Sequence, residues 1–160
     1  MSSDRVTRRT TLLSLTALAG CGFAPIYGDG GNLRGQFQFD TDDTVAGFQM
    51  RAQLEDRLGA PEQPNYVLAT RLRTSTRAAA IDPDGDTTRL NIVGTAAWQV
   101  TDGTGAVLGS GEVDAFTSYA TTASTIATQS SRDDAEARLA SILADMVVAR
   151  VLLLAQDWPA

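Results

Sequence analysis

The clearest periodicity in the chain lies near its end, where apolar residues recur at every third or fourth position. These positions are Ala135, Leu139, Ile142, Leu143, Met146, Val147, Val151 and Leu154. The spacing predicts a long helix whose apolar side covers a sheet. Ser131 with Asp134 resembles a capping box, so we expect the helix to begin there, after a Ser/Thr-rich loop over Thr121–Ser131. The run Met146–Ala155 is apolar nearly all round, which indicates either deep burial or contact with a partner.

A second, shorter helix is predicted over Val45–Leu58. Either Asp43 or Thr44 can cap its first turn, and Gly59 followed by Pro61 is typical of a helix end. Its apolar side is expected to carry Phe48, Ala52, Leu54 and Leu58. A short strand over Leu33–Phe39, alternating apolar and polar, precedes this helix.

Between the two helices, 66–119 reads as a meander of three long strands. Pro83-Asp84-Gly85 suits a three-residue hairpin loop, and this loop sets Leu68 opposite Val100. The apolar alternation independently gives the same core face. Its residues are Tyr66, Leu68 and Leu72 with Leu90, Ile92, Trp98 and Val100. Gly103-Thr104 suits a two-residue turn, which sets Trp98 opposite Gly109.

The predicted order is therefore β-α-β-β-β-α. Amphipathic helices and a sheet with one apolar face bury those faces against each other, which gives a two-layer α/β (α+β) sandwich. We expect a mostly antiparallel four-stranded sheet with two helices on one face. This single domain should span 33–160.

The first 32 residues have a different character. Arg5, Arg8 and Arg9 precede a short apolar stretch that is about half as long as a membrane span, which is typical of a removable signal peptide. The stretch closes with the lipobox Leu18, Ala19, Gly20 and Cys21. We expect a signal peptide over 1–20, a lipid on the thiol of Cys21 and a tether over 21–32. The arginine pair leaves export by the general or the twin-arginine route open.

Composition narrows the chemistry. The net charge is −6, which disfavours nucleic acid as a ligand. There is no His, all 13 basic residues are Arg, and Cys21 is the only cysteine. The commonest general base, a Schiff-base lysine, a disulfide and a His/Cys zinc site are thereby excluded. We expect no enzyme activity, no metal and no cofactor other than the covalent lipid on Cys21.

The residues that follow the lipobox cysteine add a family resemblance. Cys21–Gly28 reads Cys-Gly-Phe-Ala-Pro-Ile-Tyr-Gly, which resembles the mature start of the LptE family, the lipopolysaccharide-assembly lipoproteins of the outer membrane. The resemblance implies a plug inside an LptD-like β-barrel, help in assembling that barrel, binding of lipopolysaccharide, and a lipid-anchored position on the periplasmic side of the outer membrane. Two alternatives stay open: an auxiliary lipoprotein of an ABC-type lipid-transport complex, and a lipid-anchored hydrolase using Asp/Glu.

Four arginines form the candidate contact with lipopolysaccharide or a partner: Arg71, Arg73, Arg77 and Arg89. The first three share one strand face, and the predicted register sets Arg89 opposite Ala79, diagonal to Arg77. Guanidinium groups bind phosphate in a bidentate manner, and lipopolysaccharide carries phosphates. The alternative is an ordinary charged surface, on which Glu112 and Asp114 of the fourth strand balance the charge of the arginines.

Overall fold

Strands and helices follow one another in the predicted order. The computed structural model describes residues 33–81, 87–121 and 124–158. Its elements are β1 (Phe37–Asp40), α2 (Val45–Leu58), β2 (Tyr66–Ile81), β3 (Thr87–Asp102), β4 (Val107–Ala120), α3 (Thr125–Leu154) and a short 3₁₀ helix η1 (Ala155–Asp157). The predicted signal peptide, the tether and the loop over 83–85 lie outside the described residues.

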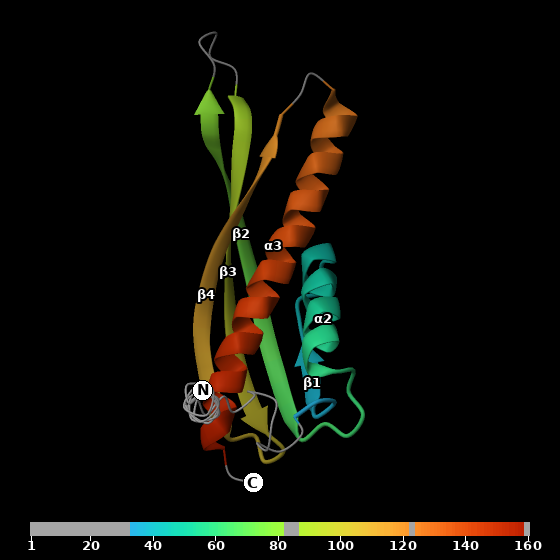
Figure 1. The fold of residues 1–160 in the computed structure, drawn as a ribbon, viewed down its shortest axis with the longest axis vertical. Helices are drawn as coiled ribbons and strands as arrows, with labels where there is room; N and C mark the ends of the chain where they lie inside the picture. Colours follow the sequence, from blue (N-terminus) through green and yellow to red (C-terminus); the bar gives the residue numbers. More distant parts are fainter. Residues whose placement is uncertain (1–32, 82–86, 122–123, 159–160) are drawn as a thin grey trace, which may run out of the picture. The chain divides into compact units, whose positions relative to one another are not determined.

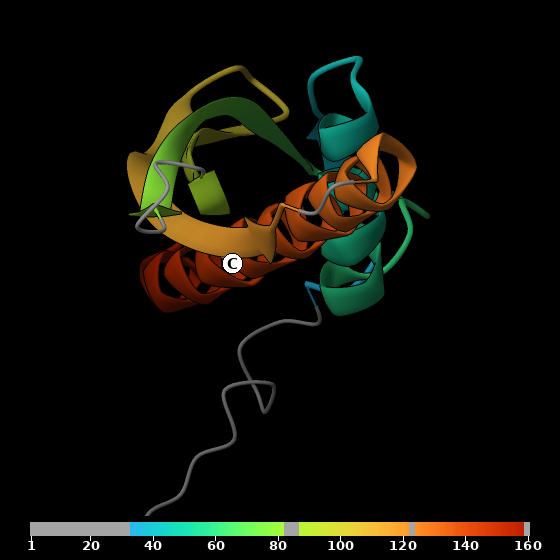
Figure 2. The same cartoon turned by 90° about the horizontal axis from the view of Figure 1, so that it is seen from above.

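The four strands form one mixed sheet in the order β1-β2-β3-β4. β1 runs parallel to β2, and the other two pairings are antiparallel. Figure 1 shows α3 running along the strands, with α2 beside it. Seen from above, the sheet is strongly curved and both helices lie on one side of it (Figure 2). The predicted two-layer sandwich is confirmed.

The core lies between α3, α2 and the inner face of the sheet. Its largest fully buried side chains include Phe37, Met50, Leu54, Leu68, Ile92, Leu139, Leu143 and Val147. α3 side chains pack directly on β3 at Gly94, where a Cβ atom would lie 2.8 Å from Leu139 Cδ2 and 3.1 Å from Leu143 Cδ1. A side chain at Gly94 would therefore force the Leu139 and Leu143 side chains to shift.

α3 is unusually apolar. The stretch Thr125–Asp157 contains an 18-residue window with a mean hydropathy of 1.8, so by length and composition alone it could cross a membrane. However, eight α3 side chains between Ala135 and Val151 are buried within the domain. For Met146–Ala155 the sequence predicted either deep burial or contact with a partner. The run is buried on one side only, because Val147 and Val151 are buried whereas Leu153 is 59% exposed.

The β2–β3 register agrees with the prediction over most of its length. Leu68 faces Val100, and the pairing continues unchanged as far as Ala78 opposite Leu90. Next to the predicted hairpin loop, a β-bulge shifts it, so Arg89 lies opposite Ala80 and not opposite Ala79. The prediction for Arg89 was wrong because one extra residue on β2 is accommodated there.

The predicted β3–β4 register is wrong by two residues. Trp98 lies opposite Gly111, not Gly109. The turn is one residue longer than expected, because Gly105 takes a positive φ of 86° and its N–H donates to the Asp102 carbonyl. A bulge at Leu108 adds the second residue. Beyond the bulge, the shift of two keeps the side chains on their predicted faces, so both glycines still lie against the Trp98 ring. Val107, before the bulge, lies opposite Thr101 and is 56% exposed.

Two further boundaries differ from the sequence prediction. α3 begins at Thr125, capped by the Ser124 hydroxyl, which accepts from Ala127 N. Its first ten residues are mostly exposed, so no apolar period marks them. β1 begins only at Phe37, because Leu33–Gln36 forms a turn with Gln36 N donating to Leu33 O. Each difference falls where few side chains are buried.

α2 has the predicted bounds but a different buried face. The Thr44 hydroxyl accepts from Gly47 N at 3.1 Å, and Gly59 ends the helix with a φ of 85°. The buried side is formed by Gly47, Met50, Leu54 and Leu58. Phe48, expected on the apolar side, is 68% exposed, and Ala52 is exposed as well. Gly47 is required because a Cβ there would collide with the Asp42 carbonyl oxygen.

One ion pair joins the two helices. Arg57 donates to both carboxylate oxygens of Asp145, at 2.8 and 3.2 Å, and Gln53 Nε2 donates to Oδ1 at 2.9 Å. The hydrogen bond from Arg57 lowers the pKa of Asp145 below its ordinary value. A lowered pKa means that the ionised form stabilises the folded state at neutral pH, and that this contribution is lost as the pH falls through the folded-state pKa.

Asp145→Asn is expected to lower the free energy of unfolding at pH 7 by up to about 1 kcal/mol, because the pair is half exposed and screened by solvent. The difference between the variant and the parent should shrink as the pH falls through the folded-state pKa of Asp145, because the carboxyl group is then protonated in both states. Urea unfolding over a series of acidic pH values measures this. Asp134→Asn, which removes a pair within α3 to Arg138, is the control. Equal effects of the two substitutions would show that the interhelix pair has no special role.

Candidate functional site

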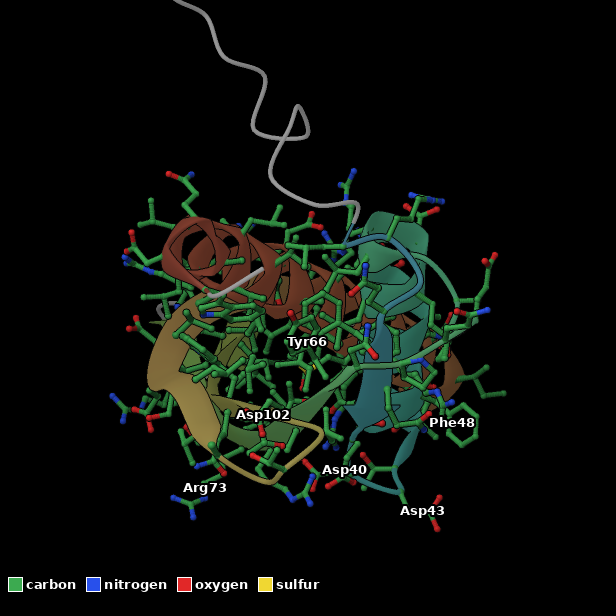
Figure 3. All side chains as sticks on the ribbon, turned by 90° about the horizontal axis from the view of Figure 1, so that it is seen from below. Asp40, Asp43, Phe48, Tyr66, Arg73 and Asp102 are labelled. Carbon is green, nitrogen blue, oxygen red and sulfur yellow. The ribbon has the colours of Figure 1, made fainter. Side chains whose placement is uncertain are left out.

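The outer face of the sheet, turned away from both helices, carries the candidate arginines. No described helix or strand covers it. Arg71, Arg73 and Arg77 alternate along β2 with the inward-facing residues, and all three are exposed. Figure 3 shows the Arg73 side chain pointing away from the helices. The structure thus places these three on one surface, as the sequence predicted.

Arg71 differs from the others because it is already paired. Its Nη2 donates to Asp40 Oδ2 at 2.7 Å, and its Nη1 donates to the Asp40 and Thr70 carbonyls. Asp42 Oδ1 lies 3.9 Å from Arg71 Nε. The hydrogen bond to Asp40 raises the pKa of Arg71 further above its ordinary value. Arg71 therefore joins the end of β1 to β2, and is not a free phosphate ligand.

In the alternative of an ordinary charged surface, Glu112 and Asp114 of β4 balance the arginines, but neither pairs with them in the described part of the chain. Asp114 lies two strands away from Arg73, with Thr95 between them, and Glu112 lies two strands away from Arg71. Strands in a sheet are about 4.8 Å apart, so these carboxylates start about 10 Å from the arginines at the backbone. The acidic partners come from β1 and the loop after it, on the opposite side of β2.

Arg73, Arg77 and Arg89 have no acidic partner among the described residues. All three are exposed. Arg89 stays on the outer face despite the bulge, because the extra residue lies on β2 and the pairing of Arg89 with Ala120 continues the regular β3–β4 ladder. Three guanidinium groups are thus available to an external anion.

Sequence reasoning missed two apolar residues on the same face. Val93 and Phe116 lie directly opposite each other on β3 and β4, and Phe116 is 66% exposed. Their row lies between the row of Arg73 and the row of Arg77. The signal was present, because Phe116 occupies an outward position in the alternation of β4, where a polar residue is usual. We call Arg73, Arg77, Arg89, Val93 and Phe116 the outer-face patch.

The other predicted site residues lie outside the described residues. These are the lipobox Leu18, Ala19 and Gly20 and the lipidation residue Cys21. Within the described ranges, no three His, Cys, Asp or Glu side chains gather in a way that could hold a metal ion. The outer-face patch can bind anionic and apolar groups together, but it contains no general base or nucleophile.

Comparison with known protein families identifies the family of this chain. The family model LptE, described as lipopolysaccharide assembly, matches residues 35–151. This chain belongs to the LptE family. The match covers both helices' packed faces and all four strands, so the resemblance first seen in Cys21–Gly28 extends through the folded domain of this LptE-family lipoprotein. A search of curated proteins found no match.

Solved structures share the fold of this LptE-family domain. A lipoprotein from Caulobacter crescentus CB15 matches with a TM-score of 0.68 and 18% identity, covering 83% of this chain and 99% of that one. Rare lipoprotein B from Shewanella oneidensis matches with a TM-score of 0.55 and 13% identity, covering 74% and 98%. Lipoprotein B from Nitrosomonas europaea matches with 0.58 and 11%, covering 78% and 87%. At these identities the comparisons establish the fold.

Proposed function

We propose that this LptE-family lipoprotein sits at the outer membrane, plugs an LptD-like β-barrel, assists assembly of that barrel and helps deliver lipopolysaccharide to the cell surface. The observation that carries the proposal is the family match over residues 35–151, which comprises nearly the whole sandwich. The lipobox ending at Cys21 supports a lipid anchor, and acyl chains give stable membrane attachment when two or more are present. The role is one of binding and positioning, without catalysis.

The outer-face patch is the proposed lipopolysaccharide contact. Phosphate groups accept paired hydrogen bonds from guanidinium groups, and Arg73, Arg77 and Arg89 are exposed and unpaired within the described part of the chain. Val93 and Phe116 between them offer an apolar surface to the fatty-acid portion of the same molecule. Arg71 of the original candidate set is left out of the contact, because Asp40 already holds its guanidinium.

Depletion of the chain in its own host tests the assembly role. We expect folded barrel in the outer membrane and lipopolysaccharide at the surface to fall together, and the intact chain to restore both. A Cys21→Ala chain, which cannot be acylated on a thiol, should restore less at equal abundance. Unchanged barrel levels after depletion would contradict the role. An auxiliary role in an ABC-type transporter predicts that inner-membrane transport is lost instead.

A further inference from the structure

β2 is much longer than β1, the strand that pairs with the edge of β2 opposite β3. β1 pairs only from Phe37 opposite Tyr66 to Asp40 opposite Ala69, whereas β2 continues to Ile81. Figure 1 shows β1 and α2 beside the lower part of the sheet, while β2, β3 and α3 continue beyond them. The second half of β2 therefore has one edge that no described strand pairs.

The hydrogen bonds of β2 identify the backbone groups on this edge. Tyr66 N donates to Gln36 O at 3.1 Å, and Leu72 N donates to the Asp42 carboxylate at 2.6 Å, both on the side of β1. Backbone groups in a strand alternate between its two edges, so every second residue points this way. The continuing residues are Thr74, Thr76 and Ala78. All three are exposed, and no described residue accepts a hydrogen bond from their N–H groups on this side.

The chain itself shows what binds along this edge. Asp40, the last residue of β1, forms an ion pair with Arg71 on the outer face. Asp42 places its carboxylate where the next strand residue would accept, and so receives the Leu72 N–H. An acidic segment in line with β1 thus meets both an edge N–H and an outer-face arginine. Arg73 and Arg77 repeat the position of Arg71 further along β2, without such a segment.

We propose that the free edge of β2 over Thr74–Ala78 is a docking site for an extended acidic segment of a partner protein, bound by strand addition. The segment would continue the line of β1. Its backbone would pair with the outward N–H and C=O groups, and its carboxylates would lie beside Arg73 and Arg77. The bulge after Ala78 ends the site. This inference goes beyond the proposed function and does not depend on it.

The other free edge fits such a segment less well. β4 has no strand on its far side in the described residues, but its outward side chains include Glu112 and Asp114, which would repel an acidic strand. The bulge at Leu108 also interrupts that edge. The acidic preference is therefore specific to the β2 edge.

Amide hydrogen exchange of the intact chain in detergent, followed residue by residue, tests the proposal. The probe is a synthetic eight-residue peptide of alternating Glu and Thr. It should slow exchange at Thr74, Thr76 and Ala78 and leave Ser75, whose N–H faces β3, unchanged. Two control peptides should give no protection. One has Lys in place of each Glu, and the other keeps Glu but is N-methylated at alternate amides. Equal protection by the Glu and Lys peptides, or by the methylated peptide, would overturn the proposal.

Thr76→Pro removes one outward N–H without touching the β2–β3 ladder, and should weaken binding of the Glu peptide about tenfold. Thr76→Val keeps the N–H and should bind as the parent does. Unchanged affinity of a folded Thr76→Pro chain would overturn the edge proposal. Lipopolysaccharide binding without any peptide protection would also overturn it while leaving the proposed function standing. If the peptide protects the edge but no β-barrel is isolated with the chain, the edge proposal stands and the proposed function is contradicted.

Discussion

Leu143→Ala is expected to lower the free energy of unfolding by about 2–5 kcal/mol, the largest effect of any single substitution considered for this domain. Leu143 is fully buried, and its Cδ1 would lie 3.1 Å from a Cβ at Gly94. The Leu143 side chain thus lies against the β3 backbone at this point. Removing the side chain leaves a cavity that the surrounding structure can close only in part. Thermal or urea unfolding measures the loss.

Ile142→Ala is the matched control. Ile142 precedes Leu143 on the same helix but is 42% exposed, so its truncation should change the free energy of unfolding by about 0.5 kcal/mol. The two residues have the same side-chain composition and similar volume, so the comparison mainly reports the orientation of α3. Equal losses in the two variants would contradict the packing of α3 on the sheet as described.

Arg73→Glu with Arg77→Glu is expected to weaken lipopolysaccharide binding by at least about hundredfold, because hydrogen bonds to charged groups contribute about 1.5–3 kcal/mol each and two are replaced by repulsion. Both side chains are exposed and unpaired in the described part of the chain, so the fold should be unaffected. Binding in vitro at two ionic strengths measures the effect, and the difference between parent and variant should shrink at high salt.

Arg34→Glu with Arg150→Glu provides the control for net charge. Both residues are exposed, and neither lies on the outer-face patch. This pair of substitutions makes the same change in charge and should leave binding within about twofold, since charges beyond about 10 Å are largely screened at 0.1 M salt. If the control loses as much affinity as the patch variant, binding depends on overall charge and the outer-face patch is not the contact.

The β2–β3 register could be predicted because two independent signals agreed. The turn residues and the alternation of apolar side chains both set Leu68 opposite Val100. At the β3–β4 turn only one signal was available. Faces repeat every two residues, so the alternation could not distinguish Gly109 from Gly111 opposite Trp98. Turn length decided the register there, and it depended on the positive φ of Gly105.

The ion-pair partner of Arg71 could be predicted only if the strand beside β2 were known. A β-α-β unit with a right-handed crossover places its two strands parallel in one sheet, and here they are neighbours. This neighbour brings Asp40 to Arg71. The sequence predicted acidic partners on β4 because it predicted the register of the antiparallel strands but not which strand lies on the other edge of β2. The exposed start of α3 was missed for a different reason, since a helix without buried side chains shows no apolar period.

Affinity isolation of the intact, lipidated chain from outer membranes in mild detergent tests the central claim most directly. The account predicts that one large β-barrel protein is recovered with the chain in a constant ratio, and that this ratio survives a salt wash because the barrel encloses a folded domain. Recovery of inner-membrane transporter subunits in place of a barrel, or of the lipoprotein with no barrel at all, would contradict it.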